Sequence, residues 1–277
     1  MRVLVTGHCG HIGTAVTDQL RTAGHVVRGY DVSDGEDVRD RPRLTEAMTG
    51  CDGVVHLAAA QKAEEADIVD VNVVGSSVVL HTAAQLAVGR VVLASSVNAL
   101  GIFMGQAPPA YLPINDDHPA HPRGAYGVSK LVMERMARRM VRERGTTVIC
   151  LRPPAVLDDA VMRRRREQRR ADVNVEWSPF WEYGAWIHRD DAAAAFVAAL
   201  TCPSPAGGFA ALLIAADDID SDRFGARQLA STLVPDVSWR GGAHYETDPY
   251  HSLVECEPAK QLLGWLPVRR WADRDVR

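Results

Sequence analysis

Long apolar runs are absent from this sequence. No stretch reaches the roughly 18 uninterrupted apolar residues that a membrane-spanning helix requires, so we expect no such helix and no membrane partner. Residues 1–6 lead directly into a glycine-containing loop. This arrangement predicts a core strand at the start of the chain, because a signal peptide would need a longer apolar region and a cleavage site.

Cysteine is also scarce. The five cysteines are scattered along the chain, at positions 9, 51, 150, 202 and 256. They show no Cys-x-x-Cys or Cys/His ligand spacing, which disfavours a disulfide framework and a metal site alike. We therefore predict small buried side chains in a reducing, cytoplasmic compartment.

A large excess of charge is missing as well. The 31 Lys and Arg residues face 35 Asp and Glu residues, and this mild acidic balance gives no reason to expect nucleic acid as a partner. The 277 residues are 47% apolar and 24% charged, which excludes a disordered or collagen-like chain. One or two folded domains with a sizeable core are expected.

Strand-like and helix-like segments alternate through the first 150 residues. Short apolar runs separated by stretches of helical spacing indicate βαβ units, and hence an α/β fold with a Rossmann-type, doubly wound parallel sheet covered on both faces. The predicted strands are 2–6, 25–30, 53–57, 90–94 and 146–151, and the predicted helices are 11–23, 42–49, 68–88 and 125–143.

The pattern loosens after Leu151, where prolines punctuate short elements. This predicts a smaller, irregular cap that is interleaved with the sheet domain. We expect a dinucleotide-binding domain over residues 1–155, with 185–215 returning to the sheet. Residues 156–184 and 216–277 would form the small C-terminal substrate-binding cap.

A glycine-rich loop follows the first predicted strand. Gly7, Gly10 and Gly13 have the spacing Gly-x-x-Gly-x-x-Gly, and His11 and Ile12 stand between the last two. Small residues allow the chain to turn tightly and its backbone to approach a pyrophosphate. The following helix presents free N–H groups and a partial positive charge to the phosphates. The loop therefore predicts a dinucleotide site.

An acidic residue ends the second predicted strand, as Asp31 stands 18 residues after Gly13. Its carboxylate can accept hydrogen bonds from both adenosine ribose hydroxyls and would repel a 2′-phosphate, which favours NAD over NADP. Two alternatives stay open. Asp31 can be a turn-capping residue, and Arg28, Arg39 or Arg41 could turn toward a phosphate.

A tyrosine and a lysine stand four residues apart at the start of a predicted helix. Tyr126 and Lys130 thus lie on one face, and a nearby ammonium favours the phenolate, which lowers the tyrosine pKa. Ser96 follows a strand, at the sheet edge where ligands of open parallel sheets bind. We predict that Tyr126 exchanges a proton with a substrate hydroxyl, that Lys130 tunes it and that Ser96 orients the oxygen. Alone, the Tyr-x-x-x-Lys pair could equally be a surface pair.

Taken together, these motifs resemble a known family, the extended short-chain dehydrogenases/reductases, also called NAD-dependent epimerase/dehydratases. The resemblance covers nearly the whole chain. The further motifs that carry it are Asp37-Val38, His56-Leu57-Ala58-Ala59, Asn72, Ser95-Ser96…Gly101, Arg152-Pro153, Trp186-Ile187-His188…Asp190-Asp191 and Lys260…Leu263-Gly264-Trp265…Pro267.

The resemblance implies NAD as cofactor, a catalytic trio and a dimer. The trio is Ser96, Tyr126 and Lys130. The further cofactor contacts that it implies are Asp37 and Val38 at the adenine, Leu57, Ala58 and Ala59 along the cofactor, and Lys130 and Pro153 near the nicotinamide. We expect the substrate to meet Ser96, Val97, Asn98 and Tyr126. Helices 68–88 and 125–143 would form the homodimer interface, through Ala83, Ala84, Ala87, Val132 and Met136.

Departures from the family pattern bear on the substrate. Val97-Asn98 stands where 4,6-dehydratases carry an Asp-Glu pair, which disfavours water elimination. Pro154-Ala155 stands where nucleotide-sugar epimerases carry an asparagine, and Gly184-Ala185 stands where they carry an arginine that meets the diphosphate. We therefore expect an NAD-dependent oxidoreductase acting at a secondary alcohol of a small, carbohydrate-like substrate. A nucleotide-sugar epimerase using transient oxidation and a non-catalytic NAD-binding regulator stay open as alternatives.

One segment is strongly basic. Residues 163–170 contain six arginines among eight residues. On a helix such arginines point in every direction, so we expect most of them to be solvated. An anion contact and a nucleic-acid surface are the alternatives, and 163–170 or Arg240 could substitute for the absent diphosphate contacts.

Overall fold

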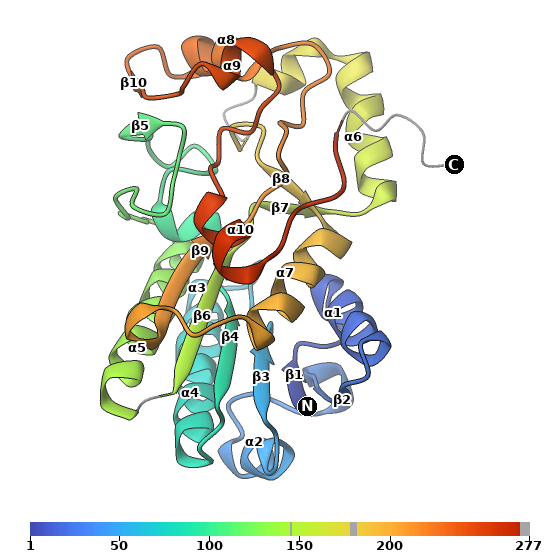
Figure 1. The fold of residues 1–277 in the computed structure, drawn as a ribbon, viewed down its shortest axis with the longest axis vertical. Coiled ribbons are helices and arrows are strands. Elements are labelled where there is room, and N and C mark those ends of the chain that lie inside the picture. Colours follow the sequence, from blue (N-terminus) through green and yellow to red (C-terminus); the bar gives the residue numbers. More distant parts are fainter. Residues whose placement is uncertain (145, 178–181, 272–277) are drawn as a thin grey trace.

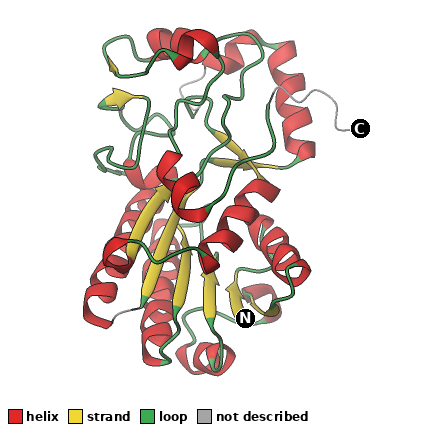
Figure 2. Cartoon of the chain, in the orientation of Figure 1, coloured by secondary structure: helices red, strands yellow, loops and turns green. Residues whose placement is uncertain are grey.

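A computed structural model describes residues 1–144, 146–177 and 182–271. Its centre is a six-stranded, wholly parallel sheet (Figures 1 and 2). In spatial order the strands are β2 (Val26–Tyr30), β1 (Arg2–Thr6), β3 (Gly53–His56), β4 (Arg90–Ala94), β6 (Thr147–Arg152) and β9 (Phe209–Leu213). This architecture is the Rossmann-type α/β fold that the alternation of elements predicted.

Helices cover both faces of the sheet and bury two separate cores. One core packs the sheet against α1 (His11–Thr22), α7 (Arg189–Thr201) and α10 (Glu257–Leu263). The other packs it against α2 (Arg41–Met48), α4 (Ser76–Gln85) and α5 (Ala125–Arg144). With both faces covered, the strands carry continuous apolar runs, and all four residues of β3 are buried.

The remaining elements lie beyond the carboxyl ends of the sheet strands, in the upper part of Figure 1. Two small parallel pairs form there, between β7 (Ala155–Leu157) and β8 (Trp186–His188) and between β5 (Tyr111–Leu112) and β10 (Ser238–Trp239). The helices of this region are α6 (Asp159–Ala171), α8 (Ala226–Leu233) and α9 (His244–Thr247). Parts of the predicted cap, residues 178–181 and 272–277, lie outside the described residues.

The helical stretch predicted over 68–88 differs in its bounds and regularity. It begins with α3 (Glu65–Val69), continues through a π-helical segment (Asp70–Gly75) and ends with α4 at Gln85. The end has a local cause, because Ala87 adopts a left-handed conformation with φ 52°.

The position of α4 also changes the expected dimer surface. Ala83 is fully buried against the sheet, so it cannot line an interface between copies. Ala87 is exposed, and Ala84, Val132 and Met136 are half-buried.

Among the helices that the structure describes, none combines the length and apolar character needed to span a bilayer.

Candidate active site

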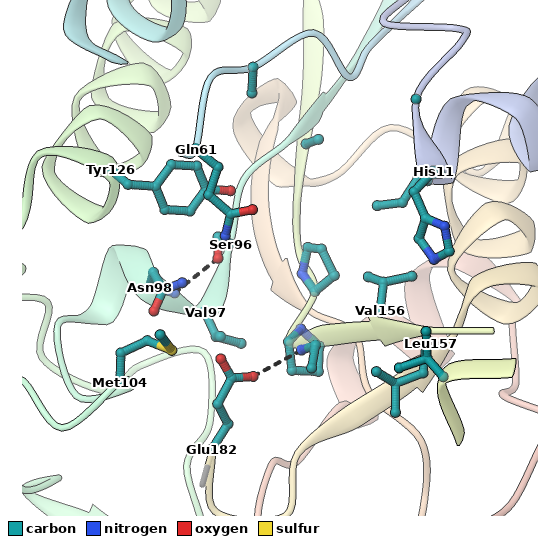
Figure 3. A pocket seen from close by; sticks show the side chains of 18 of the residues that line it. His11, Gln61, Ser96, Val97, Asn98, Met104, Tyr126, Val156, Leu157 and Glu182 are labelled. Carbon is teal, nitrogen blue, oxygen red and sulfur yellow. Dashed lines mark hydrogen bonds between the residues drawn. The ribbon is translucent and has the colours of Figure 1, made fainter. Parts of the chain in front are cut away.

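A cavity of about 810 Å³ lies at the carboxyl edge of the sheet. Its walls come from the β1–α1 loop, the ends of β3 and β4, the start of α5, β7 and one face of α6. Figure 3 shows Tyr126, Ser96 and Glu182 facing the cavity from one side and His11 from the other. Residues far apart in the sequence thus meet around one space, at the edge where open parallel sheets bind ligands.

The glycine loop is wound so tightly that side chains would not fit. Gly7 has φ +71°, and a Cβ atom on it would lie 2.6 Å from the backbone nitrogen of Ala58. A Cβ atom on Gly13 would lie 2.1 Å from the carbonyl oxygen of Gly7. Gly10 precedes α1 without a side-chain cap, so the first N–H groups of the helix are left for a ligand. Gly7, Gly10, His11, Ile12 and Gly13 all line the cavity, and this backbone cradle fits a dinucleotide pyrophosphate.

Asp31 lies behind this loop rather than in the wall of the cavity. Its carboxylate accepts hydrogen bonds from the backbone nitrogen of Cys9 (3.1 Å) and from the backbone nitrogen and hydroxyl of Ser33 (3.0 and 2.9 Å). Burial acts to raise the pKa of Asp31, but the hydrogen bonds from Ser33 and Cys9 outweigh it and lower the pKa. The carboxylate therefore stays ionised beside the glycine loop.

The three arginines near Asp31 are each occupied by other groups. Arg28 pairs with Glu36. Arg39 is bonded to Asp37 and to Asp70, and Arg41 donates to the side-chain oxygen of Gln85 at 2.9 Å. In this arrangement none of them turns toward a 2′-phosphate.

The other residues predicted at the cofactor fall into two groups. Leu57, Ala59 and Pro153 line the cavity. Asp37, Val38 and Ala58 do not: the Asp37 carboxylate is engaged by Arg39, Val38 is buried, and Ala58 packs beneath Gly7.

Ser96, Tyr126 and Lys130 converge in the cavity wall. The Ser96 side chain lies close enough to the Tyr126 hydroxyl to lower its pKa. The Nζ atom of Lys130 lies 5.5 Å from the centre of the Tyr126 ring and donates to the carbonyl oxygen of Ala94 at 2.8 Å. Ser96 Oγ also accepts a hydrogen bond from the backbone nitrogen of Asn98 (3.1 Å), which Figure 3 shows as a dashed line. This is the juxtaposition that the sequence motifs predicted.

The electrostatics of the tyrosine differ from the prediction. Burial raises the pKa of Tyr126, the Ser96 hydrogen bond lowers it, and the charge of Glu182 raises it. The expected lowering by Lys130 was wrong for this structure, because the ammonium bonds the Ala94 carbonyl and lies over the ring. Burial also lowers the pKa of Lys130 to about 8.

Hydrogen bonds at the first turn of α5 fix the backbone of Tyr126. The side-chain oxygen of Asn72 accepts a hydrogen bond from the backbone nitrogen of Ala60 at 2.8 Å, and its nitrogen donates to the Ala60 carbonyl oxygen at 2.9 Å. The same nitrogen donates to Ser129 Oγ at 3.0 Å. The Ser129 hydroxyl in turn donates to the carbonyl oxygen of Tyr126 at 2.7 Å. The π-helical segment that carries Asn72 is thereby tied to the first turn of α5.

A buried ionic network joins α5 to the ends of β4 and β6. Glu134 accepts from Nε and Nη2 of Arg152 at 2.8 and 2.7 Å, and from the hydroxyl of Ser95 at 2.5 Å. Both charged side chains are at most 9% exposed. Ser95 directly precedes Ser96, and Arg152 directly precedes Pro153, so this network sets the positions of two stretches of the cavity wall.

Sequence motifs missed an acidic residue of the cavity. Glu182 lines it, and its Oε2 atom accepts a hydrogen bond from the backbone nitrogen of Ala155 at 3.0 Å. Burial raises the pKa of Glu182 to about 7, against a smaller lowering by Arg165. Arg165 and Arg169 of α6 also line the cavity. Glu182 belongs to no motif, so only its position in the folded chain could have identified it. The arginine run 163–170 was noted with an anion contact as an alternative, but the sequence did not indicate which of its arginines face the cavity.

Comparisons with known proteins agree with this geometry. A model of the NAD dependent epimerase/dehydratase family matches residues 3–209. Cinnamoyl-CoA reductase 1 of Arabidopsis thaliana is 27% identical over 180 residues, which are 56% of this chain and 52% of that protein. Uronate dehydrogenase of Agrobacterium fabrum is 29% identical over 150 residues, 50% of this chain and 54% of that protein. The chain thus spans about half the length of these curated relatives.

A solved structure extends the likeness to almost the whole chain. A short-chain dehydrogenase/reductase superfamily protein from Agrobacterium tumefaciens, crystallised with NAD, has a TM-score of 0.72 and 24% identity. The match covers 98% of this chain and 94% of that one, and it shows a common fold. The family model covers well over half of the sequence, and the family that it describes is NAD-dependent. The chain belongs to the NAD-dependent epimerase/dehydratase family.

Proposed function

We propose that this protein is an NAD-dependent dehydrogenase that oxidises a secondary alcohol of a small, carbohydrate-like substrate. The observation that carries the proposal is the convergence of Ser96, Tyr126 and Lys130 on the cavity that the glycine loop also lines. When bound, NAD supplies a hydride acceptor. The glycine loop would hold its pyrophosphate, Asp31 its adenosine ribose, and Leu57, Ala59 and Pro153 the rest of the molecule.

Each of the three side chains has a distinct part in this proposal. Ser96 Oγ, held by the backbone nitrogen of Asn98, donates to the substrate oxygen and orients it. The phenolic oxygen of Tyr126 takes the hydroxyl proton. The ammonium of Lys130, which the Ala94 carbonyl holds 5.5 Å from the centre of the Tyr126 ring, would bind the nicotinamide ribose. In the absence of substrate, the Ser96 hydroxyl instead acts on Tyr126 and offsets part of the rise in the Tyr126 pKa that burial causes.

The remaining expectations follow from the same arrangement. We propose that 156–184 and 216–277 form the substrate cap over a cofactor domain of 1–155 and 185–215. We propose a cytoplasmic homodimer that buries α4 and α5, with no nucleic-acid or membrane partner. Light scattering at micromolar concentration tests the dimer, and a monomeric mass would contradict it.

Spectrophotometry tests the enzymatic role. The protein is incubated with NAD and a panel of aldoses, hexuronic acids and UDP-sugars while NADH absorbance is followed. We expect NADH to accumulate with at least one probe. Conversion of a sugar to its epimer without accumulating NADH would instead assign an epimerase, and NAD binding with no conversion of any probe would favour a regulator.

A tyrosine variant ties turnover to the site. Tyr126→Phe removes the proton acceptor and should lower kcat by about 10²–10⁴-fold, the usual contribution of a positioned acid or base. Tyr250→Phe is the matched control, because Tyr250 is exposed and lies outside the cavity wall. Unchanged turnover in Tyr126→Phe would refute the role given to the phenol.

A further inference from the structure

The arginine-rich helix α6 presents two different faces. Arg163, Arg164 and Arg170 are exposed, as the sequence predicted for most of this run. Arg165 and Arg169, four residues apart, instead line the cavity that holds Tyr126. The side chain of Arg169 is only 4% exposed, and that of Arg165 is 35% exposed.

One carboxylate holds both of these arginines. Arg165 Nη1 and Arg169 Nη2 lie 2.9 and 2.8 Å from the same oxygen of Asp220, whose side chain is 2% exposed. Asp220 is fixed in turn, because its backbone nitrogen donates to the carbonyl oxygen of Gly184 at 3.0 Å. Two guanidinium charges therefore share one counter-charge, which leaves an excess of one positive charge in this wall of the cavity.

One hydrogen-bond donor of Arg169 has no acceptor in the described part of the protein. Within the part of the chain that the structure describes, Nη1 of Arg169 is buried and has no hydrogen-bond partner. The Arg169 guanidinium lies 5.0 Å from the ring centre of Trp271, which stacks against it but offers no acceptor there. Oδ1 of Asp220 is likewise buried without a partner among the described residues, so the chain itself leaves this cluster incompletely satisfied. A buried donor without an acceptor costs free energy, and a ligand oxygen bound by Arg169 would offset that cost.

The neighbouring acid does not cancel this excess. Glu182 bonds the backbone of Ala155, and burial raises its pKa to about 7, so a large part of it is neutral near pH 7. Lys62 and Lys130 also line the cavity, but of the residues that the structure describes, Arg165 and Arg169 supply its only guanidinium groups.

We propose that Arg165 and Arg169 form a subsite for an anionic group of the substrate, a carboxylate or a phosphate. This deepens the proposed function and rests on it, since the group would anchor the carbohydrate whose alcohol faces Tyr126. Guanidinium donors match the two oxygens of a carboxylate or phosphate, and charge-assisted hydrogen bonds of this kind are among the strong ones. The substrate class is therefore an acidic sugar or a sugar phosphate rather than a neutral sugar.

Binding is measured without turnover, by calorimetry on the protein saturated with NADH, which cannot accept a hydride. The paired probes are glucuronate with glucose, galacturonate with galactose, glucose 6-phosphate with glucose, and UDP-glucose with glucose. We expect at least one anionic probe to bind more tightly than its neutral counterpart. The hexuronates would identify a carboxylate as the ligand, and the other two anions a phosphate.

Variants of α6 locate the subsite. Arg165→Met should lower the affinity for the preferred anion about 10–100-fold, the usual contribution of a charge-assisted hydrogen bond. The affinity for the neutral probe should stay unchanged. Arg165→Lys should recover part of the loss. Arg164→Met removes the same charge from the exposed side of the helix and should change nothing. Equal thermal midpoints would show that all three variants are folded.

The outcomes separate this proposal from the proposed function. If no alcohol is oxidised but the anion preference depends on Arg165, the subsite stands and the dehydrogenase assignment fails. If a neutral sugar is oxidised and bound as well as its acidic counterpart, the subsite is wrong. The subsite is equally wrong if no anionic probe binds, or if the preference survives in Arg165→Met.

Discussion

Glu134 carries the negative charge of the buried network beside the active site. Replacing it by glutamine removes this charge and nearly preserves the size of the side chain, so the effect of the charge can be measured separately. The change keeps the volume of the side chain, so no cavity is created. It leaves the Arg152 guanidinium, which is 9% exposed, without the carboxylate that now accepts two of its hydrogen bonds. The glutamine amide group would also place N–H donors opposite those of Arg152 or Ser95.

The expected loss follows from these contacts. Breaking a buried ion pair by removing one partner costs about 3–5 kcal/mol, because the other charge stays buried and uncompensated. Asp116 is a second carboxylate near Arg152, whose charge acts to lower the Asp116 pKa. Because Asp116 still compensates part of the Arg152 charge, we expect a loss of stability at the lower end of this range, about 3 kcal/mol. For a chain of this size, that corresponds to a fall in Tm of roughly 6–12 °C.

Calorimetry and urea unfolding measure the loss, with Glu46→Gln on the exposed side of α2 as the control. The double variant Glu134→Gln/Arg152→Met should lose less stability than the two single losses added together, because the buried charge is gone as well. A loss below about 1 kcal/mol for Glu134→Gln, or strict additivity in the double variant, would refute the reasoning.

Further predictions concern the cofactor loop and a second buried acid. Gly13→Ala places a methyl group 2.1 Å from the Gly7 carbonyl oxygen, so NAD affinity measured by calorimetry should fall more than about tenfold, and unchanged affinity would contradict the tight cradle. Asp31→Ser removes the carboxylate that repels a 2′-phosphate, so the ratio of NAD to NADP affinity should fall, and a constant ratio would contradict its role. Burial raises the pKa of Asp116 to about 6, so the wild type should lose up to about 3 kcal/mol relative to Asp116→Asn as pH rises from about 3 to 7, measured by urea unfolding. The asparagine oxygen can still accept from Leu213, and a difference independent of pH would count against this assignment.

Local spacing explains why so much of the cofactor half was predictable. The glycine interval of the β1–α1 loop and the four-residue interval between Tyr126 and Lys130 are properties of a turn and of a helix face, and both depend only on neighbouring residues. Strand β4 was predicted with the bounds that the structure shows, because a strand buried on both faces reads as a continuous apolar run. The helix before it was less regular than predicted, since a tertiary contact of Asn72 accompanies its π-helical segment.

By itself, then, the sequence determined the fold class, the glycine-rich cofactor loop and the shared helix face of Tyr126 and Lys130, because periodicity and short-range spacing carry those features. The resemblance to a family added Ser96 to this pair. Only the tertiary structure decided which arginines of α6 turn inward, where Glu182 lies and in which direction the pKa of Tyr126 moves. The reason is physical: burial and the pairing of Arg165 with Asp220 depend on segments about 55 residues apart in the chain, and no local pattern records which of them come together.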